Sequence, residues 1–169
     1  PELPGIHLHT NAQLWTPAMW ASLPEPVRAG IKSAEISIDA ATAATYAVNR
    51  RGGGFERLLE NLGFIRTLRA DGPLRWVCIS MVVQDNNFEE MPDFVRLGKR
   101  CGFDRVYFSQ LVNWGTFSDK EFRARAVHVP GHPRHDRLVE TLKDPAFADP
   151  AVLLGNLSGL RGPAAAARG

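Results

Sequence analysis

The residues best suited to bind a ligand lie between the strand-like run AEISID and an amphipathic stretch that begins FERLLENL. Asp39 ends the strand-like run, and Arg50, Arg51 and three glycines precede the amphipathic stretch. An arginine guanidinium can form two parallel, charge-assisted hydrogen bonds with a carboxylate. This grouping of an acid, two arginines and a glycine-rich loop favours a site for a small anionic or zwitterionic ligand.

A second group with possible chemistry is formed by histidines. His7 and His9 would share one face of a short strand, and with Asp39 they have the ligand types of a metal site in a barrel lyase or hydrolase. No second carboxylate stands at a telling spacing, so packing in a core or an interface is the favoured interpretation. Three further histidines in or beside a loop rich in proline and glycine receive no assigned role: His128, His132 and His135.

Strand-like and helix-like stretches alternate along the chain. Strands are expected near residues 6–9, 34–39, 76–83 and 105–111, with a further short strand at 152–154. Helices are expected near residues 17–23, 55–69, 119–125 and 134–143, with another that Gly102 ends. Such alternation predicts right-handed crossovers between parallel strands of an α/β fold.

Local signals mark several helix starts. Thr42 is a candidate N-cap. The pairs Asn87 with Glu90 and Ser118 with Glu121 have the spacing of a capping box, in which the two side chains satisfy free backbone amides. For Asn87 this structural role is favoured over a role in ligand binding.

Two architectures fit the alternation, an open doubly wound sheet and a piece of a β/α barrel. Ligands bind at the carboxyl ends of the strands in both. The expected strands end in polar residues: Thr10 and Asn11, Asp39, Gln84 to Asn87, and Ser109 with Gln110. The sequence therefore predicts a polar rim above an apolar sheet.

Composition narrows the class of protein. The 169 residues and 44% hydrophobic content suit one folded domain, and 20 basic against 18 acidic residues leave no basic stripe for nucleic acid. No apolar run approaches the length of a membrane span, so a cytoplasmic protein is expected. Cys78 and Cys101 lie on different expected elements, which gives neither a disulfide framework nor the cysteine spacing of a metal site.

The order of several short motifs resembles that of radical S-adenosylmethionine (SAM) enzymes. These motifs are HTN after the first strand, SID ending the second, an R-G element before FERLLENL, the turn VVQDNN with F-E-E, and the strand VYF. The resemblance covers about residues 6–113 and is to the subgroup with additional iron–sulfur clusters. It implies that the α/β units form part of a (β/α)6 partial TIM-type barrel, as its third to sixth strands.

One departure from that family concerns its cluster-binding half. Members carry a C-x3-C-x2-C motif and a Gly-Gly-Glu motif on earlier strands, and neither occurs here. The resemblance therefore implies a later half-barrel, with SAM and a [4Fe–4S] cluster belonging to a full-length protein that cleaves SAM reductively to a radical and acts on an unknown substrate. This chain alone is expected to be inactive and to bind no cofactor. The alternative is a non-catalytic α/β module that assembles with another chain.

The resemblance assigns roles at the end of the second strand. Ser37 and Asp39 would face the ribose and methionine parts of SAM, and Arg51 would meet its carboxylate. All three side chains are then expected to converge on one concavity. Ser37 and Asp39 would share the inner face of the strand, while Ile36 and Ile38 pack outward against helices.

It also assigns roles to other rim residues. Asn11 matches the asparagine of a Thr-Asn-Gly motif, in which Ala12 replaces the glycine. Asn87 and Glu90 match an Asn-x-x-Glu motif, and the segment around Gln110 would offer backbone groups to adenine.

The expected boundaries are a barrel piece over residues 1–158 and a low-complexity, disordered tail over residues 159–169. A half-barrel leaves an uncovered strand edge near residues 5–9, with apolar surface beside it, and this predicts self-association.

Overall fold

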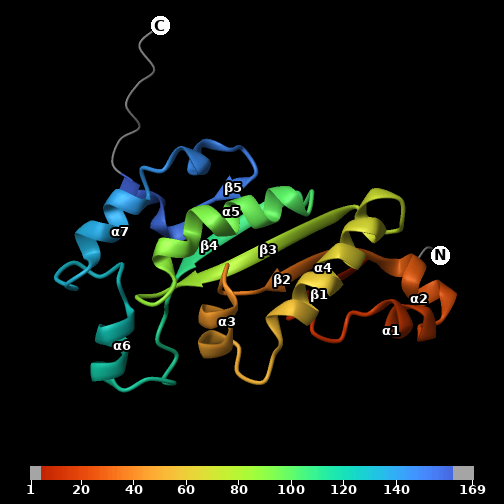
Figure 1. The fold of residues 1–169 in the computed structure, drawn as a ribbon, viewed down its shortest axis with the longest axis horizontal. Helices are drawn as coiled ribbons and strands as arrows, with labels where there is room; N and C mark the ends of the chain where they lie inside the picture. The colour runs from red at the N-terminus through yellow and green to blue at the C-terminus, as the bar shows by residue number, and fades with distance from the viewer. Residues whose placement is uncertain (1–4, 162–169) are drawn as a thin grey trace, which may run out of the picture.

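The sheet contains parallel strands whose order in space is their order in the chain (Figure 1). The computed structural model describes residues 5–161, and the strands there are β1 (Ile6–Thr10), β2 (Ile31–Ser37), β3 (Trp76–Val83), β4 (Arg105–Gln110) and β5 (Val152–Leu153). The parallel α/β fold predicted from the alternation is confirmed. A doubly wound sheet requires a reversal of strand order, and the order β1-β2-β3-β4-β5 contains none.

Helices connect the strands. They are α1 (Pro17–Ser22), α2 (Glu25–Gly30), α3 (Ala43–Asn49), α4 (Phe55–Ala70), α5 (Met91–Arg100), α6 (Asp119–Arg125) and α7 (His135–Thr141), with short 3-10 helices η1 (Phe88–Glu90), η2 (Pro145–Ala148) and η3 (Gly155–Arg161). Thr42 caps α3 by accepting a hydrogen bond from the amide of Thr45. The capping box of Ser118 and Glu121 at α6 is also confirmed.

One face of the sheet forms the hydrophobic core. Ile36, Ile79 and Val106 are neighbours in register on adjacent strands, and their side chains are buried. Helix α5 lies so close to them that a Cβ atom on Gly98 would come within 2.5 Å of Val106 Cγ2. Helix α4 contributes its apolar stripe to the same core: Leu58, Leu62, Ile65 and Leu68.

The opposite face of the sheet carries mainly polar side chains. In the register of the ladder, Ser37, Ser80 and Tyr107 form one row across β2, β3 and β4. Glu35 and Arg105 belong to the next row toward the N-terminal ends of the strands. We call this surface the polar face. Side chains alternate between the two faces along each strand, so the burial of Ile36 fixes Ser37 on the polar face.

Strand β2 differs from its predicted bounds at both ends. It begins at Ile31 and ends at Ser37, so Asp39 lies beyond the strand rather than in it. Asp39 has a backbone φ of 61°, which ends the extended conformation and the alternation of faces. The other strand bounds agree with the predicted ones to within a residue.

The ends of the described chain bear on two other expectations. The domain boundary expected at residue 158 falls inside η3, which continues to Arg161. The rest of the expected tail, residues 162–169, lies outside the described residues.

Strand β1 forms one edge of the sheet, and an apolar pocket of about 240 Å³ adjoins it, lined in part by Ile6, Trp15 and Trp20. Strand β1 is thus an edge strand with apolar surface beside it, as expected, and self-association stays a prediction. Within residues 5–161, no helix has the length and apolar character needed to cross a membrane.

Candidate functional site

A polar pocket of about 390 Å³ opens where β1 and β2 end. Its lining residues come from the loop after β1, from α3 and from the loop that follows α3: Asn11, Gln13, Tyr46, Asn49, Arg50, Arg51, Gly52 and Gly53. We call it the rim pocket. It lies at the carboxyl ends of two parallel strands, which is the usual position of ligand sites in such sheets.

Gln13 fixes the two loops of the rim pocket to each other. Its Nε2 donates hydrogen bonds to Tyr46 Oη at 2.9 Å and to the carbonyl of Gly54 at 3.0 Å. Its Oε1 accepts from the amide of Gly54 at 3.0 Å. Asn61, on α4, donates to the carbonyl of Ala12 at 2.7 Å. The pocket walls are thus held by side chains that no local sequence pattern had singled out.

Ala12 has a left-handed backbone, with φ of 57°, and its side chain is buried. Thr10 Oγ1 accepts a hydrogen bond from the Ala12 amide at 3.0 Å and helps to hold this conformation. Glycine adopts positive φ without the steric cost that an alanine Cβ incurs. The chain therefore makes a glycine-type turn at this position, although the residue is alanine.

The glycines beside the arginines have a steric role. Gly52 has φ of 81°, which side-chain-bearing residues rarely adopt. At Gly53 a Cβ atom would lie 3.0 Å from Tyr46 Oη and 3.2 Å from the carbonyl of Arg50. The glycines let the loop turn tightly against Tyr46 and present Arg51 at the pocket.

Arg50 forms an ion pair with Asp39. Arg50 Nη2 lies 2.6 Å from Asp39 Oδ2, and Asp39 Oδ1 accepts a hydrogen bond from the Val82 amide at 2.7 Å. Burial raises the pKa of Asp39 above its ordinary value, although Arg50 and the Val82 amide act in the opposite direction. Arg50 Nε is buried without a hydrogen-bond partner within the described residues. Asp39 therefore pairs with Arg50 and leaves the neighbouring Arg51 without this partner.

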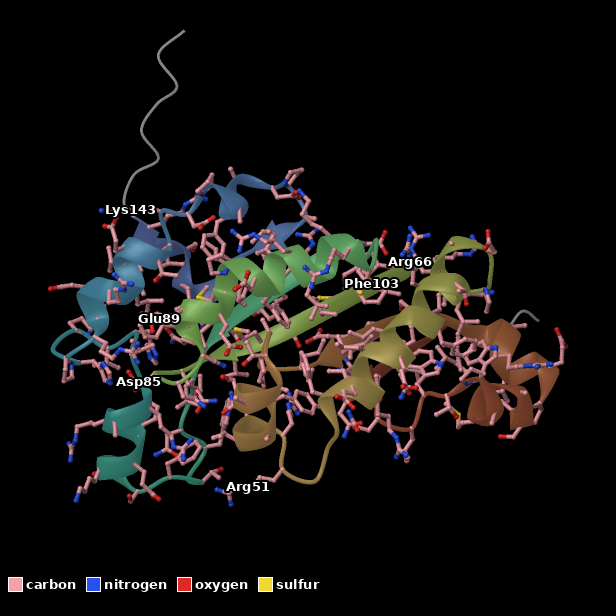
Figure 2. The ribbon with its side chains drawn as sticks, in the orientation of Figure 1. Arg51, Arg66, Asp85, Glu89, Phe103 and Lys143 are labelled. Atoms are coloured by element: carbon pink, nitrogen blue, oxygen red, sulfur yellow. The ribbon has the colours of Figure 1, made fainter. Side chains whose placement is uncertain are left out.

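Arg51 lines the rim pocket with an exposed side chain. Within residues 5–161 it forms no ion pair, and Figure 2 shows it on the outer margin of the loop after α3. Asn11 Oδ1 accepts a hydrogen bond from the Gln13 amide at 3.1 Å, and its Nδ2 has no partner in the same range. One free guanidinium and one free amide donor therefore meet at the rim pocket, and both suit an anionic oxygen.

No protein-family model matches the sequence, and no curated protein matches it.

The expected convergence of Ser37, Asp39 and Arg51 does not occur. Only Arg51 lines the rim pocket. Ser37 lies on the polar face, where Ser80 Oγ is 3.5 Å from its hydroxyl. The positive φ of Asp39 turns its carboxylate toward Val82 and Arg50, so Asp39 reaches the pocket only through Arg50. Ile36 and Ile38 are buried in the core, as predicted.

Asn87 is a structural residue rather than a ligand-binding one. Its Nδ2 donates to the carbonyls of Asp39 at 3.0 Å and Val82 at 2.9 Å, while its Oδ1 accepts from the Gln84 amide at 2.7 Å. Its side chain is 1% exposed. All of its hydrogen-bonding atoms hold the ends of β2 and β3 together, which leaves none for a ligand.

Glu90 also acts at long range, so the capping box predicted for it with Asn87 is wrong. Its carboxylate accepts hydrogen bonds from the amides of Ala41 and Thr42 and from the hydroxyls of Thr42 and Thr45. These contacts place its negative charge at the N-terminus of α3, where free amides favour it. Glu90 thereby fixes the helix that carries Asn49 at its end.

Gln110 lies apart from the rim pocket. It ends β4, and its amide donates a hydrogen bond to Asn156 Oδ1 at 2.8 Å. The rim pocket receives residues from the first two β/α units only. The structure therefore brings together Asn11 and Arg51 of the expected site residues, and connects Asp39 to them through Arg50.

The histidines form two separate groups. His7 and His9 lie near Glu35, with one ligand atom of each residue within 4.8 Å of the others, and Asp39 is not in this group. In the second group, His132 Nε2 lies 3.2 Å from the carbonyl of Ala124. Burial lowers the pKa of His128 below its ordinary value.

The two cysteines face different environments. Cys78 belongs to the polar-face row of Glu35 and is buried, and burial raises the pKa of its thiol to about 12. Cys101 follows α5 and packs against the hydrophobic core on the opposite face. The two thiols lie on opposite faces of the sheet, so they cannot ligate the same iron–sulfur cluster.

Proposed function

We propose that this chain forms later β/α units of a radical SAM enzyme's barrel, and that its rim pocket receives the amino-carboxylate end of SAM. The proposal begins from the resemblance of the ordered motifs HTN, SID, R-G, VVQDNN and VYF. Each motif is short, so the support comes from the order of the motifs along the chain and from the positions of their residues in the fold.

The fold agrees with successive units of a barrel. Parallel strands follow one another in chain order, helices α4 and α5 pack on one face, and the other face carries polar residues. In a closed or partial barrel of this kind, helices surround the strands and side chains of the opposite face point inward. On this proposal the polar face lines the barrel interior, and the rim pocket lies at the end where barrel enzymes bind ligands.

The observation that carries the proposal is that two adjacent arginines line one pocket and have different environments. Arg50 is held by Asp39 at 2.6 Å, whereas the adjacent Arg51 has an exposed guanidinium and no ion pair within the described residues. Arg51 is thus available for the ligand carboxylate, with Asn11 Nδ2 as a second donor. Asp39 neutralises Arg50, so the pocket offers one net positive charge for one carboxylate.

In this class of enzymes SAM supplies a radical when it is cleaved on a reduced [4Fe–4S] cluster. Because Cys78 and Cys101 lie on opposite faces of the sheet and cannot share a cluster, the proposal assigns the cluster to a longer protein. It gives this chain binding and orientation of SAM, in contrast to the expectation that the chain alone binds no cofactor. The clamped loops around Gln13 hold the donors in fixed positions before the ligand arrives, which lowers the entropic cost of binding.

The test is a titration of the ¹⁵N-labelled chain followed by nuclear magnetic resonance. SAM is expected to shift the signals of Arg51 Nε, Asn11 Nδ2 and the Gly52 amide. The matched ligand is decarboxylated SAM, which keeps the adenosine, the sulfonium and the amino group but has no carboxylate, and it should leave these signals in place. Equal shifts with both ligands, or none with SAM, would contradict the proposal.

A further inference from the structure

We propose that the polar face binds a divalent transition-metal ion through His7, His9 and Glu35. The three residues come from adjacent parallel strands, with His9 directly opposite Glu35 in the register of β1 and β2. One ligand atom from each residue lies within 4.8 Å of the other two. This inference does not depend on the function proposed for the rim pocket, which lies at the ends of the strands rather than on the face of the sheet.

The backbone already places the three side chains on the same side of the sheet. His7 and His9 are two residues apart on β1, and their ring centroids are 4.7 Å apart. His9 Nδ1 lies 4.0 Å from Glu35 Oε2. Ligands at about 2.1 Å from a tetrahedral zinc ion stand roughly 3.4 Å from one another. The ligand atoms must therefore come closer together to bind a zinc ion. Rotation of side chains is sufficient for this, because His9, at 68% side-chain exposure, is free to rotate.

Ser33 fixes the orientation of one ligand. Its Oγ lies 2.7 Å from His7 Nδ1, and in the tautomer in which Nδ1–H donates to this hydroxyl, Nε2 is the nitrogen left for a metal ion. A hydrogen bond to the second ring nitrogen is the usual partner of a metal-ligating histidine, because it fixes the ring and its tautomer. His7 thus has the second interaction that distinguishes a ligand from a freely rotating surface histidine.

The ligand set indicates which ions would bind. Two imidazoles and one carboxylate suit Zn²⁺, whereas Mg²⁺ and Ca²⁺ prefer sites made of oxygen ligands. Three protein ligands leave a coordination position open for water or another small ligand. Arg105 stands in the same row as Glu35, two strands away, and its positive charge opposes a cation. Exposed ligands and this charge predict weak binding rather than a structural zinc site.

The experiment uses the chain freed of metal by a chelator and titrated with Zn²⁺ against a competing colorimetric indicator. We expect one ion per chain, with a dissociation constant below about 1 mM. His7→Gln, His9→Gln and Glu35→Gln should each weaken binding about 10-fold or more, since each removes one of three ligands. His135→Gln and Glu56→Gln, which alter residues outside the cluster, are the matched controls and should keep the wild-type affinity.

A spectroscopic readout separates ligation from general charge effects. Zn²⁺ should shift the ring nitrogen signals of His7 and His9 in the ¹⁵N-labelled protein and leave those of His132 unchanged. Mg²⁺ at the same concentration should shift none of them. Zn²⁺ binding that persists in the double variant His9→Gln/Glu35→Gln, or wild-type binding weaker than about 1 mM, would overturn the proposal.

Discussion

Arg50 Nη2 lies 2.6 Å from Asp39 Oδ2, and this ion pair ties the C-terminus of α3 to the end of β2. The pair is largely shielded, with 27% and 12% of the two side chains exposed. The adjacent Arg51 is exposed and lines the rim pocket without an ion pair in the described part of the chain. The two neighbouring arginines therefore have different roles: Arg50 stabilises the fold, and Arg51 is available at the pocket.

This division predicts opposite effects of two alanine substitutions on stability. Arg50→Ala leaves the buried Asp39 carboxylate without its cation and should lower the free energy of unfolding by about 1.5–3 kcal/mol. Arg51→Ala removes no contact with another charged group and should change it by less than about 0.5 kcal/mol. Urea unfolding followed by circular dichroism measures both. Equal losses in the two variants would show that the assignment of duties is wrong.

The raised pKa of Asp39 predicts a specific dependence of stability on pH. The folded state binds the Asp39 proton more tightly than the unfolded state, so the carboxyl group's contribution to stability is largest below the unfolded pKa of about 3.9 and is lost as pH rises through the folded pKa. The free energy of unfolding of wild type minus that of Asp39→Asn should therefore fall as pH rises from about 4.

Asp104 provides the matched comparison of opposite sign. Hydrogen bonds from Arg69, at 2.8 and 2.7 Å, together with one from the Val77 amide, lower the pKa of Asp104. Its contribution is present above the unfolded pKa and is lost as pH falls through the folded pKa. The corresponding difference for Asp104→Asn should thus rise with pH over the acid range. A difference curve for Asp39 that rises in the same way would contradict the account of its burial.

The left-handed conformation of Ala12 predicts that its substitution by glycine has little effect on stability. Ala12→Gly relieves a conformational cost of about 1 kcal/mol, which offsets the loss of a buried methyl group worth about 0.8 kcal/mol. Stability should therefore stay within about 0.5 kcal/mol of wild type. Ala34 is equally buried but lies inside β2. There, Ala34→Gly loses the methyl group and adds backbone freedom to the unfolded chain, so it should destabilise by about 1.5 kcal/mol. Similar losses in the two variants, measured by thermal unfolding, would rule out strain at Ala12.

The sequence predicted the elements whose signals are local. The apolar run WVCISMVV gave the bounds of β3, and Ser118 with Glu121 gave the start of α6. In each case residues close in the chain determine the local structure. The parallel sheet followed from the alternation of such elements, since short crossovers between strands allow few other arrangements.

The sequence could not predict contacts whose partners are distant in the chain. Asn87 and Glu90 have the spacing of a capping box, yet their partners include Asp39 and Thr42, more than forty residues earlier. Arg50 and Arg51 are indistinguishable by type, and only the turn at the end of α3 decides which one meets Asp39. A backbone at positive φ, as at Asp39, likewise reverses the expected direction of a side chain. Local periodicity contains no information about any of these three features.

The measurement that tests the central claim most directly is the affinity of Arg51→Ala for SAM, compared with that of Arg57→Ala. Arg57 is an exposed arginine in the first turn of α4 that does not line the rim pocket, so it controls for the loss of one positive charge. Both affinities are obtained from the concentration dependence of the Asn11 Nδ2 signal. The account predicts that Arg51→Ala raises the dissociation constant about 10-fold or more, equivalent to about 1.4 kcal/mol, and that Arg57→Ala leaves it unchanged. An unchanged dissociation constant in Arg51→Ala would contradict the assignment of this pocket to SAM.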